Sequence, residues 1–296
     1  MDALILKYYI FKKLIEKLPN VIKANLQYTD NELVNYVSFN TSPLFINKDK
    51  YELYDNFKSD KYKDFIIEVI INLSIKNDYQ KLLFTYGLLI SNYVDIYFNE
   101  YLRNIDSETS INILFNMLDL YVSEINEIDL NDKIFKEFTY YDYMDELIHS
   151  PLIRIYNFLC SKAYFNIAYK KMNKFYNKNK KIRNYKKEEC IYPTTINTLL
   201  LNKDKNKMTV LGKNINYDLN DFINYVINKI LNDIKAINEY LFEKQNDHFR
   251  EIFNIDKDKK IWATSSYFLF FYYSFWIIHI DLIYIKMNSF ILLEYR

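Results

Sequence analysis

Glycine is nearly missing from this chain: Gly87 and Gly212 are the two glycines among 296 residues, whereas about 7% is usual. Glycine supplies the left-handed backbone conformations that phosphate-binding loops and tight hairpin turns require. Neither a dinucleotide-binding fingerprint nor a Walker loop can be written with one glycine in each half of the chain. The sequence therefore excludes both nucleotide-binding motifs and favours helices over a β-rich fold.

Cysteine and net charge are also low. Cys160 and Cys190 are far apart and do not form a CxxC pair, so the sequence supports neither a zinc finger nor a disulfide scaffold. We expect a reducing cytoplasmic setting. The formal net charge of +1 gives no overall attraction to nucleic acid, which is not an expected partner. The apolar run at the N-terminus carries Asp2 and Lys7 and does not predict a secretory signal.

Histidine, the commonest general base and metal ligand, occurs three times, as His149, His248 and His279. No two of them lie four residues apart on one helix. Glu146 and His149 form half of a Glu-x-x-His metal motif, but the second copy that such a site needs does not occur. A solvated helix face with local charge pairs, which would also include Asp145, is the favoured interpretation.

Helical periodicity runs through most of the chain and predicts an all-α, multi-helix bundle. Pro19 ends the first helix, Thr29 and Glu32 match a capping box, and Pro151 suits the first position of a later helix. The clearest helix begins at Asp218, after an irregular connection over residues 190–217. Its broad apolar stripe consists of Leu219, Phe222, Ile223, Val226, Ile227, Ile230, Leu231, Ile234, Ile237, Leu241 and Phe242. The expected helices span residues 4–18, 29–37, 59–73, 78 to beyond 95, 107–125, 151–176 and 218–242.

The C-terminal part differs in composition from the rest. We expect one helical domain over residues 1–256 and an apolar, aromatic-rich tail over 257–296. Residues 267–280 are uncharged, but His279 and Asp281 would lie within the hydrocarbon if the tail crossed a membrane. A docked or membrane-interfacial helix is therefore favoured over a membrane span. The expected location is the cytoplasm, with membrane association through this tail as the alternative.

A basic stretch precedes the irregular connection and is interleaved with Tyr169, Phe175, Tyr176 and Tyr185. Clustered positive charge among aromatic rings can bind phosphate groups or anionic lipid. In a nearly neutral chain, a solvated helix end and loop is the favoured alternative. The candidate anion-binding surface consists of Lys170, Lys171, Lys174, Lys178, Lys180, Lys181, Arg183, Lys186 and Lys187.

The segment from Tyr86 to Tyr101 has the frame of a metal-site helix without its histidines. Ser91, Asp95 and Asn99 stand at i, i+4 and i+8, a spacing that places ligands near one helix face. Together with Gly87 and Tyr101, this frame resembles the bacterial zinc-dependent phospholipase C family. The characteristic helix of that family has Gly, then His, then Asp and His at successive four-residue steps, followed by Pro-Tyr. Asp95 is the one ligand position kept here, because Ser91 and Asn99 replace the histidines.

The resemblance extends over residues 1–256. Lys7 stands where the early histidine of the family would fall, and residues 40–45 resemble its Gly-Pro-Asp loop but keep only Pro43. Residues 110–119, where a His-x-x-x-Glu pair would be expected, contain no histidine. The helix from Asp218 resembles the last core helix of the family. The resemblance thus implies a phospholipase-C-like bundle in which Lys7, Ser91 and Asn99 are degenerate ligand positions.

For function, the resemblance implies a member that has kept the fold and lost the catalysis, with no cofactor. Serine and asparagine are weak zinc ligands, and Lys7 would repel the ion, so we expect an ion pair between Lys7 and Asp95 in its place. One alternative is an active metal-dependent phosphodiester hydrolase with an altered site, using zinc with Asp95 and Asp119. Another is a helical scaffold or membrane-associated binding protein, with phospholipid or a membrane surface as partner.

Overall fold

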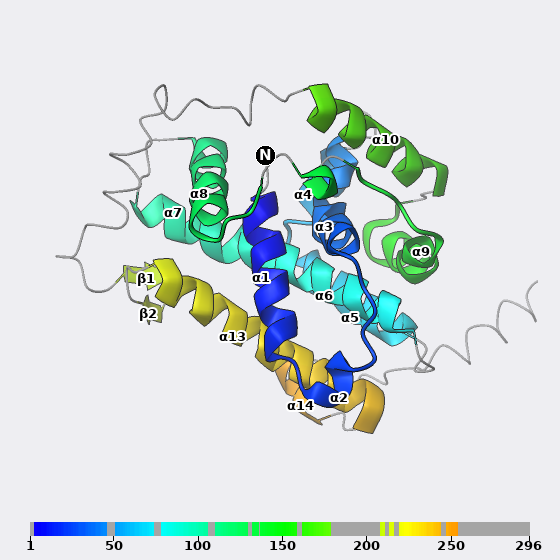
Figure 1. The fold of residues 1–296 in the computed structure, drawn as a ribbon. Coiled ribbons are helices and arrows are strands. Elements are labelled where there is room, and N and C mark those ends of the chain that lie inside the picture. Colours follow the sequence, from blue (N-terminus) through cyan, green and yellow to red (C-terminus); the bar gives the residue numbers. More distant parts are fainter. Residues whose placement is uncertain are drawn as a thin grey trace, which may run out of the picture. The chain divides into compact units, whose positions relative to one another are not determined.

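The computed structural model describes residues 3–45, 51–73, 78–105, 110–129, 132–135, 137–158, 162–178, 208–210, 213–215, 219–243 and 247–253. The chain divides into two compact units, Met1–Asn254 and Ile255–Arg296. The described residues all belong to the first unit (Figure 1). The expected tail over residues 257–296 and both cysteines lie outside the described residues.

The all-α class predicted from the sequence is confirmed. The helices are α1 (Leu4–Lys17), α2 (Asn20–Lys23), α3 (Asp30–Ser38), α4 (Tyr51–Asn56), α5 (Lys61–Asn72), α6 (Tyr79–Tyr93), α7 (Asn99–Ile105), α8 (Ile111–Ile125), α9 (Asp142–Tyr156), α10 (Lys162–Lys178), α13 (Leu219–Asn238) and α14 (Asp247–Ile252). Two 3₁₀ segments, η1 (Phe39–Phe45) and η4 (Lys133–Phe135), and two π-helical segments, η3 (Val94–Phe98) and η5 (Glu239–Glu243), join or extend them. Strands β1 (Met208–Val210) and β2 (Lys213–Ile215) form an antiparallel hairpin within the predicted irregular connection.

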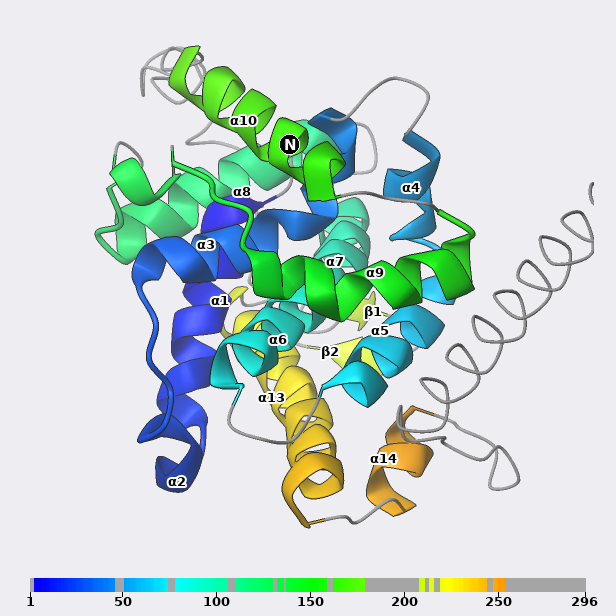
Figure 2. The same ribbon diagram turned by 90° about the vertical axis from the view of Figure 1, so that its right-hand side faces the viewer.

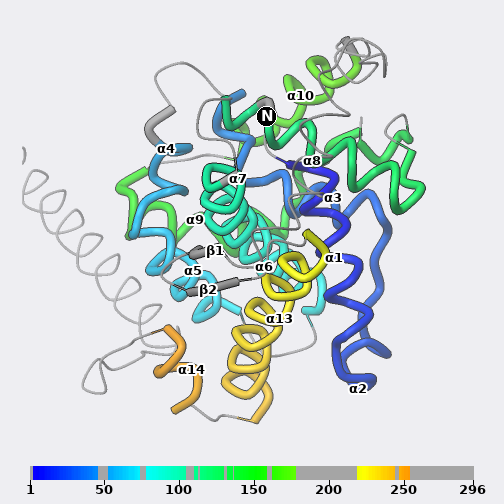
Figure 3. Tube along the Cα trace, turned by 90° about the vertical axis from the view of Figure 1, so that its left-hand side faces the viewer, coloured from blue at the N-terminus to red at the C-terminus, as the bar shows by residue number. Residues whose placement is uncertain are grey.

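Helix α6 forms the centre of the unit and contacts α1, α3, α5, α9 and α13 (Figure 2). Its residues 82–91 are all buried. A helix that is buried on every side must be apolar on every side, and this one matches that rule apart from Thr85 and Ser91. Helices α1 and α13 lie against each other on one flank of α6 (Figure 3). The sequence that resembles a metal-site helix therefore forms the core of the bundle.

Two predicted helix starts are confirmed by their side-chain caps. Thr29 Oγ1 accepts a hydrogen bond from the Glu32 amide at 3.2 Å, and Glu32 Oε2 accepts one from the Thr29 amide at 2.8 Å, which completes a capping box for α3. The Asp78 carboxylate accepts a hydrogen bond from the Lys81 amide at 3.2 Å at the start of α6. Local sequence thus fixes where these two helices begin.

The predicted helix over residues 151–176 is wrong. Pro151 lies inside α9, and a break at Asn157, which has the left-handed φ of 52°, separates α9 from α10. A proline inside a helix leaves the carbonyl four residues earlier without its amide donor. Asn72 of α5 supplies a replacement, because its Nδ2 donates to the Leu147 carbonyl at 3.3 Å. A tertiary contact therefore lets α9 continue through its proline.

Helix α13 confirms the helix predicted from Asp218, but its predicted apolar stripe fails at the far end. Residues 239–243 are π-helical, and Phe242 is 47% exposed although the stripe would bury it. A π-helical turn carries i→i+5 hydrogen bonds, so it shifts the angular positions of the residues that follow. Periodicity based on the α-helix cannot foresee that shift.

Gly87 allows α6 to approach α3 closely. A Cβ atom built on Gly87 would lie 2.5 Å from Tyr36 Cβ and 3.0 Å from the Tyr36 carbonyl carbon. Neither atom can move without moving α3 itself. This glycine therefore serves helix packing rather than a turn.

Gly87→Ala should destabilise the protein. Alanine gains about 1 kcal/mol in helix propensity, but overpacking a tight core costs about 1–3 kcal/mol, and contact with backbone favours the upper part of that range. We expect a net loss of about 1–2 kcal/mol in the free energy of unfolding, measured by urea denaturation. Gln80→Ala, at an exposed position of the same helix, is the control. A more stable Gly87→Ala protein would contradict the packing described here.

Candidate functional site

Lys7 and Asp95 form an ion pair, as the sequence predicted. Lys7 Nζ lies 2.7 Å from Asp95 Oδ1, and the two side chains are 0% and 16% exposed. Lys7 comes from the buried face of α1, whereas Asp95 comes from η3, directly after the core helix α6. The pair therefore ties α1 to the centre of the bundle.

Asp95 is the ion-pair partner of the Lys7 ammonium in the part of the chain that the structure describes. Among the described residues, Nζ has no partner that meets hydrogen-bond geometry, so its attraction to Asp95 is ionic rather than directional. Taking an ammonium out of water costs several kcal/mol, and a close carboxylate must offset that cost. Asp95 is thus a structural counter-ion for a completely buried charge.

A second carboxylate, Asp119, binds the backbone of Leu6, the residue before Lys7 in α1. Asp119 Oδ1, on α8, accepts a hydrogen bond from the Leu6 amide at 2.9 Å. The first amides of a helix have no partners within the helix and carry partial positive charge, so a carboxylate placed there is stabilising. Asp95 and Asp119 therefore hold consecutive residues of α1, one through a side chain and the other through the backbone.

Ser91, Asp95 and Asn99, the i, i+4 and i+8 positions of the predicted frame, do not lie on one helix face. Ser91 is completely buried and its Oγ has no hydrogen-bond partner within the described ranges, whereas Asn99 is exposed. The π-helical segment η3 lies between them and changes their angular relation. Asp95 and Asn99 line a pocket of about 450 Å³, together with Phe57, Lys58, Asn92, Ile96, Glu100, Arg103, Ile111, Asn112 and Phe115. We call this the Asp95 pocket.

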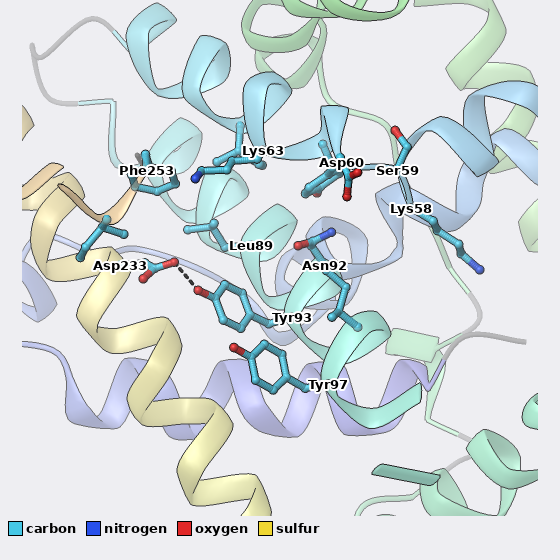
Figure 4. A pocket seen from close by; sticks show the side chains of 14 residues that line it. Lys58, Ser59, Asp60, Lys63, Leu89, Asn92, Tyr93, Tyr97, Asp233 and Phe253 are labelled. Carbon is cyan, nitrogen blue, oxygen red and sulfur yellow. Dashed lines mark hydrogen bonds between the residues drawn. The ribbon is translucent and has the colours of Figure 1, made fainter. Parts of the chain in front are cut away.

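A second pocket, of about 460 Å³, adjoins the Asp95 pocket and contains residues that the sequence analysis missed. Of its two carboxylates, Asp60 is exposed and Asp233 of α13 is buried, and the Tyr93 hydroxyl donates a short hydrogen bond to Asp233 Oδ2 (Figure 4). Asp233 interrupts the apolar stripe of its helix, since it lies three residues after Ile230 and four before Ile237. A charged residue in that stripe was the signal that could have found it.

Burial controls the protonation of this hydrogen-bonded pair. Desolvation raises the pKa of Asp233 from its ordinary 3.8 to about 6, although the Tyr93 hydrogen bond and the charges of Lys229, Lys63 and His248 oppose the rise. Burial and the neighbouring carboxylate raise the pKa of Tyr93 well above its ordinary value. Tyr93 therefore remains the donor and Asp233 the acceptor at neutral pH.

In its described part, the basic stretch buries two of its four aromatic residues, Tyr169 and Tyr176, instead of presenting them as a platform. Lys170, Lys171 and Lys174 are exposed on α10, but Tyr169 and Tyr176 are buried at 2% and 5% exposure. Tyr169 donates its hydroxyl to the Asn35 carbonyl at 3.2 Å. The Lys178 side chain and residues 180–187 lie outside the described part. What is described of the stretch is a charged face over a packed aromatic core.

Among the residues that the structure describes, those of the Glu-x-x-His half-site do not share a common partner. Glu146 forms an ion pair with Lys81 at 2.8 Å, and Asp145 accepts a hydrogen bond from the Tyr140 hydroxyl at 3.1 Å. His149 is exposed. In the described ranges, no three His, Cys, Asp or Glu side chains form a group that could hold a metal ion. The solvated-face interpretation of this motif fits these contacts.

Comparisons with family models, curated proteins and solved structures give no match for this chain. Within the part of the chain that the structure describes, no helix combines the length and the apolar character needed to cross a bilayer. Any functional assignment must therefore start from the two pockets and the charges that line them.

Proposed function

We propose that this chain is a phospholipase-C-like helical protein without catalytic activity, in which the Lys7–Asp95 ion pair replaces the metal centre. The observation that carries the proposal is the 2.7 Å contact between a completely buried ammonium and Asp95, the retained ligand position. A zinc ion bound by Asp95 would have to share this carboxylate with the Lys7 ammonium, which already contacts Oδ1.

Electrostatic repulsion supports the same conclusion. Zinc bound by Asp95 would lie within a few Å of the Lys7 ammonium. Repulsion between charges of +1 and +2 amounts to about 8 kcal/mol at 4 Å, with an effective dielectric constant of about 20. The neighbouring Ser91 and Asn99 are weak zinc ligands and could not offset this cost. Lys7, Ser91 and Asn99 therefore do not fit a zinc ion beside Asp95.

Zinc content and hydrolysis test the proposal directly. The full chain, purified without chelator and dialysed against zinc, should contain far less than one zinc per chain by elemental analysis. It should not hydrolyse phosphatidylcholine or bis-p-nitrophenyl phosphate above the buffer rate. One zinc per chain that disappears in Asp95→Asn, together with hydrolysis that disappears with it, would instead establish the active-hydrolase alternative with Asp95 and Asp119. Asp221→Asn, an exposed carboxylate on α13, is the matched control.

Membrane association is the second candidate function, favoured by the exposed lysines of α10. Lys170, Lys171 and Lys174 form one charged group, and each lysine near an anionic bilayer contributes about 1 kcal/mol. The full chain should then float with vesicles that contain phosphatidylserine, and replacing these three lysines by glutamine should weaken the association. If the substitution leaves flotation unchanged, the three lysines do not mediate the association and the tail becomes the candidate segment. If the full chain does not float, membrane association is ruled out as a function.

A further inference from the structure

The pocket that contains Asp233 is built from five elements of the unit. Its floor is the end of α6 with η3, and its walls come from α5 and the preceding residues 58–60, from α13, and from α14 with the following Phe253 (Figure 4). It shares Lys58, Asn92 and Ile96 with the Asp95 pocket. Its charged residues are Lys58, Asp60 and Lys63 on one side and Asp233 on the other (Figure 4).

One end of this pocket has the chemistry of a cation site. Asp233 is 8% exposed, and Tyr93 uses one of its two carboxylate oxygens. The rings of Tyr93 and Tyr97 stack at 5.4 Å with 10° between their planes, and Figure 4 shows both hydroxyls directed toward the α13 side, where Asp233 lies. Hydroxyl oxygens and a desolvated carboxylate can accept hydrogen bonds from an ammonium group, whereas the carboxylate would repel an anion.

The facing wall has a net positive charge, from Lys58 and Lys63 with Asp60 between them in the sequence. Lys63 lies on α5 and is exposed, and its positive charge is close enough to lower the pKa of Asp233. Within the described residues, however, no ion pair joins Lys63 to Asp233. Apolar side chains, among them Leu89 and Phe253, line the wall between the charges. The pocket therefore has a single carboxylate, Asp233, at one end and a net positive group, Lys58 and Lys63 with Asp60, at the other, with an apolar surface between them.

We propose that this pocket binds a small organic zwitterion, with its ammonium group against Asp233 and the two tyrosines and its anionic group against Lys63. A plain cation would leave Lys63 unused and suffer its repulsion, and a plain anion would meet Asp233. A molecule with both charges and a short apolar spacer satisfies both walls at once. The inference uses none of the Lys7–Asp95 contacts, so it does not depend on the proposed function.

Matched probes separate the two charges. The full chain is titrated by calorimetry with γ-aminobutyrate and ε-aminocaproate, and with the single-charge analogues butylammonium, hexylammonium, butyrate and hexanoate. The two amino acids differ in spacer length, so one of them should match the distance between the walls. We expect that zwitterion to bind at least tenfold more tightly than either analogue of the same length, a difference of about 1.4 kcal/mol.

Substitutions on the two walls should affect different probes. Asp233→Asn should weaken the binding of the zwitterion and of the alkylammonium at least tenfold and leave the binding of the carboxylate analogue unchanged. Lys63→Met should weaken the binding of the zwitterion and of the carboxylate analogue. Asp221→Asn on α13 and Lys61→Met on α5, both exposed, are the matched controls and should change nothing. Equal binding of the carboxylate and the zwitterion, insensitivity to Asp233→Asn, or no binding of any probe at about 10 mM would overturn the proposal.

Discussion

Asp95→Asn should lower the free energy of unfolding by about 3–5 kcal/mol, because it leaves the ammonium of Lys7 buried without a counter-charge. Lys7 is 0% exposed and cannot reach water unless α1 moves. The asparagine has nearly the same shape as the aspartate, so packing stays nearly constant and the charge is the main change. Urea denaturation of the full chain at neutral pH measures the effect.

A double-mutant cycle identifies the ion pair as the cause. In the Lys7→Met protein, the stranded charge is Asp95, which is 16% exposed and keeps some hydration. The second substitution, Asp95→Asn, should therefore cost much less in that background than in the wild type, with a coupling energy of about 2–3 kcal/mol. Simple additivity of the two substitutions would show that the pair contributes nothing.

The surface pair Lys13–Glu16 supplies the comparison. Its atoms approach to 2.9 Å, nearly as close as the Lys7–Asp95 pair, but the two side chains are 40% and 59% exposed. Exposed ion pairs contribute about 0–1 kcal/mol because water screens them. Lys13→Met should therefore change stability by less than about 1 kcal/mol. The contrast between the two pairs isolates burial as the determining factor.

The sequence predicted those parts of the fold that depend on local signals. The capping box of Thr29 and Glu32, the cap at Asp78 and the long helix from Asp218 each depend on residues within a few positions of one another. The Lys7–Asp95 contact was predicted across 88 positions of the chain only because the family resemblance placed both residues at one site. Periodicity by itself could not have paired them.

The misses have physical causes that lie outside local sequence. Pro151 stays inside a helix because Asn72, 75 positions from Leu147, donates to the orphaned carbonyl. The π-helical segments η3 and η5 change the periodicity that any α-helical pattern assumes. Asp233 was overlooked because eleven apolar neighbours define the stripe of its helix more strongly than one charge does. In each case, a tertiary contact or a change of helix type overrode the local pattern.

Asp233→Asn should stabilise the folded protein at neutral pH. The carboxyl group titrates at about 6 in the folded state and near 3.8 when unfolded, because burial disfavours its charged form. Below pH 3.8 both states hold the proton and the group contributes no difference. Between pH 3.8 and about 6 the unfolded state releases its proton first, so the stability of the wild type falls as pH rises. Above pH 6 the folded protein bears the full free-energy penalty of burying the ionised Asp233 carboxylate.

The gain from Asp233→Asn should therefore grow from near zero at pH 3.8 to a plateau of about 3 kcal/mol above pH 6, the energy equivalent of the raised pKa. Asparagine can still accept the Tyr93 hydrogen bond, which limits other losses. Urea denaturation across this pH range, compared with Asp221→Asn, measures the profile, and NMR titration of the Asp233 carboxyl group gives its pKa directly. A variant that is no more stable than the wild type at pH 8 would show that the carboxylate bears no penalty.

Neighbouring charges provide the sharpest form of this test. Lys229 of α13, Lys63 of α5 and His248 of α14 all favour the ionised carboxylate, as does the Tyr93 hydroxyl of α6. Tyr93→Phe should therefore raise the pKa of Asp233 further and move the loss of wild-type stability to higher pH, and Lys63→Met should act in the same direction. Repeating the series in a His248→Gln background removes one of these neighbouring charges. If Asp233→Asn stabilises the protein in that background too, the gain in the free energy of unfolding comes from removing a carboxylate that the fold holds desolvated. A destabilising buried charge of this kind is expected to persist at a binding site.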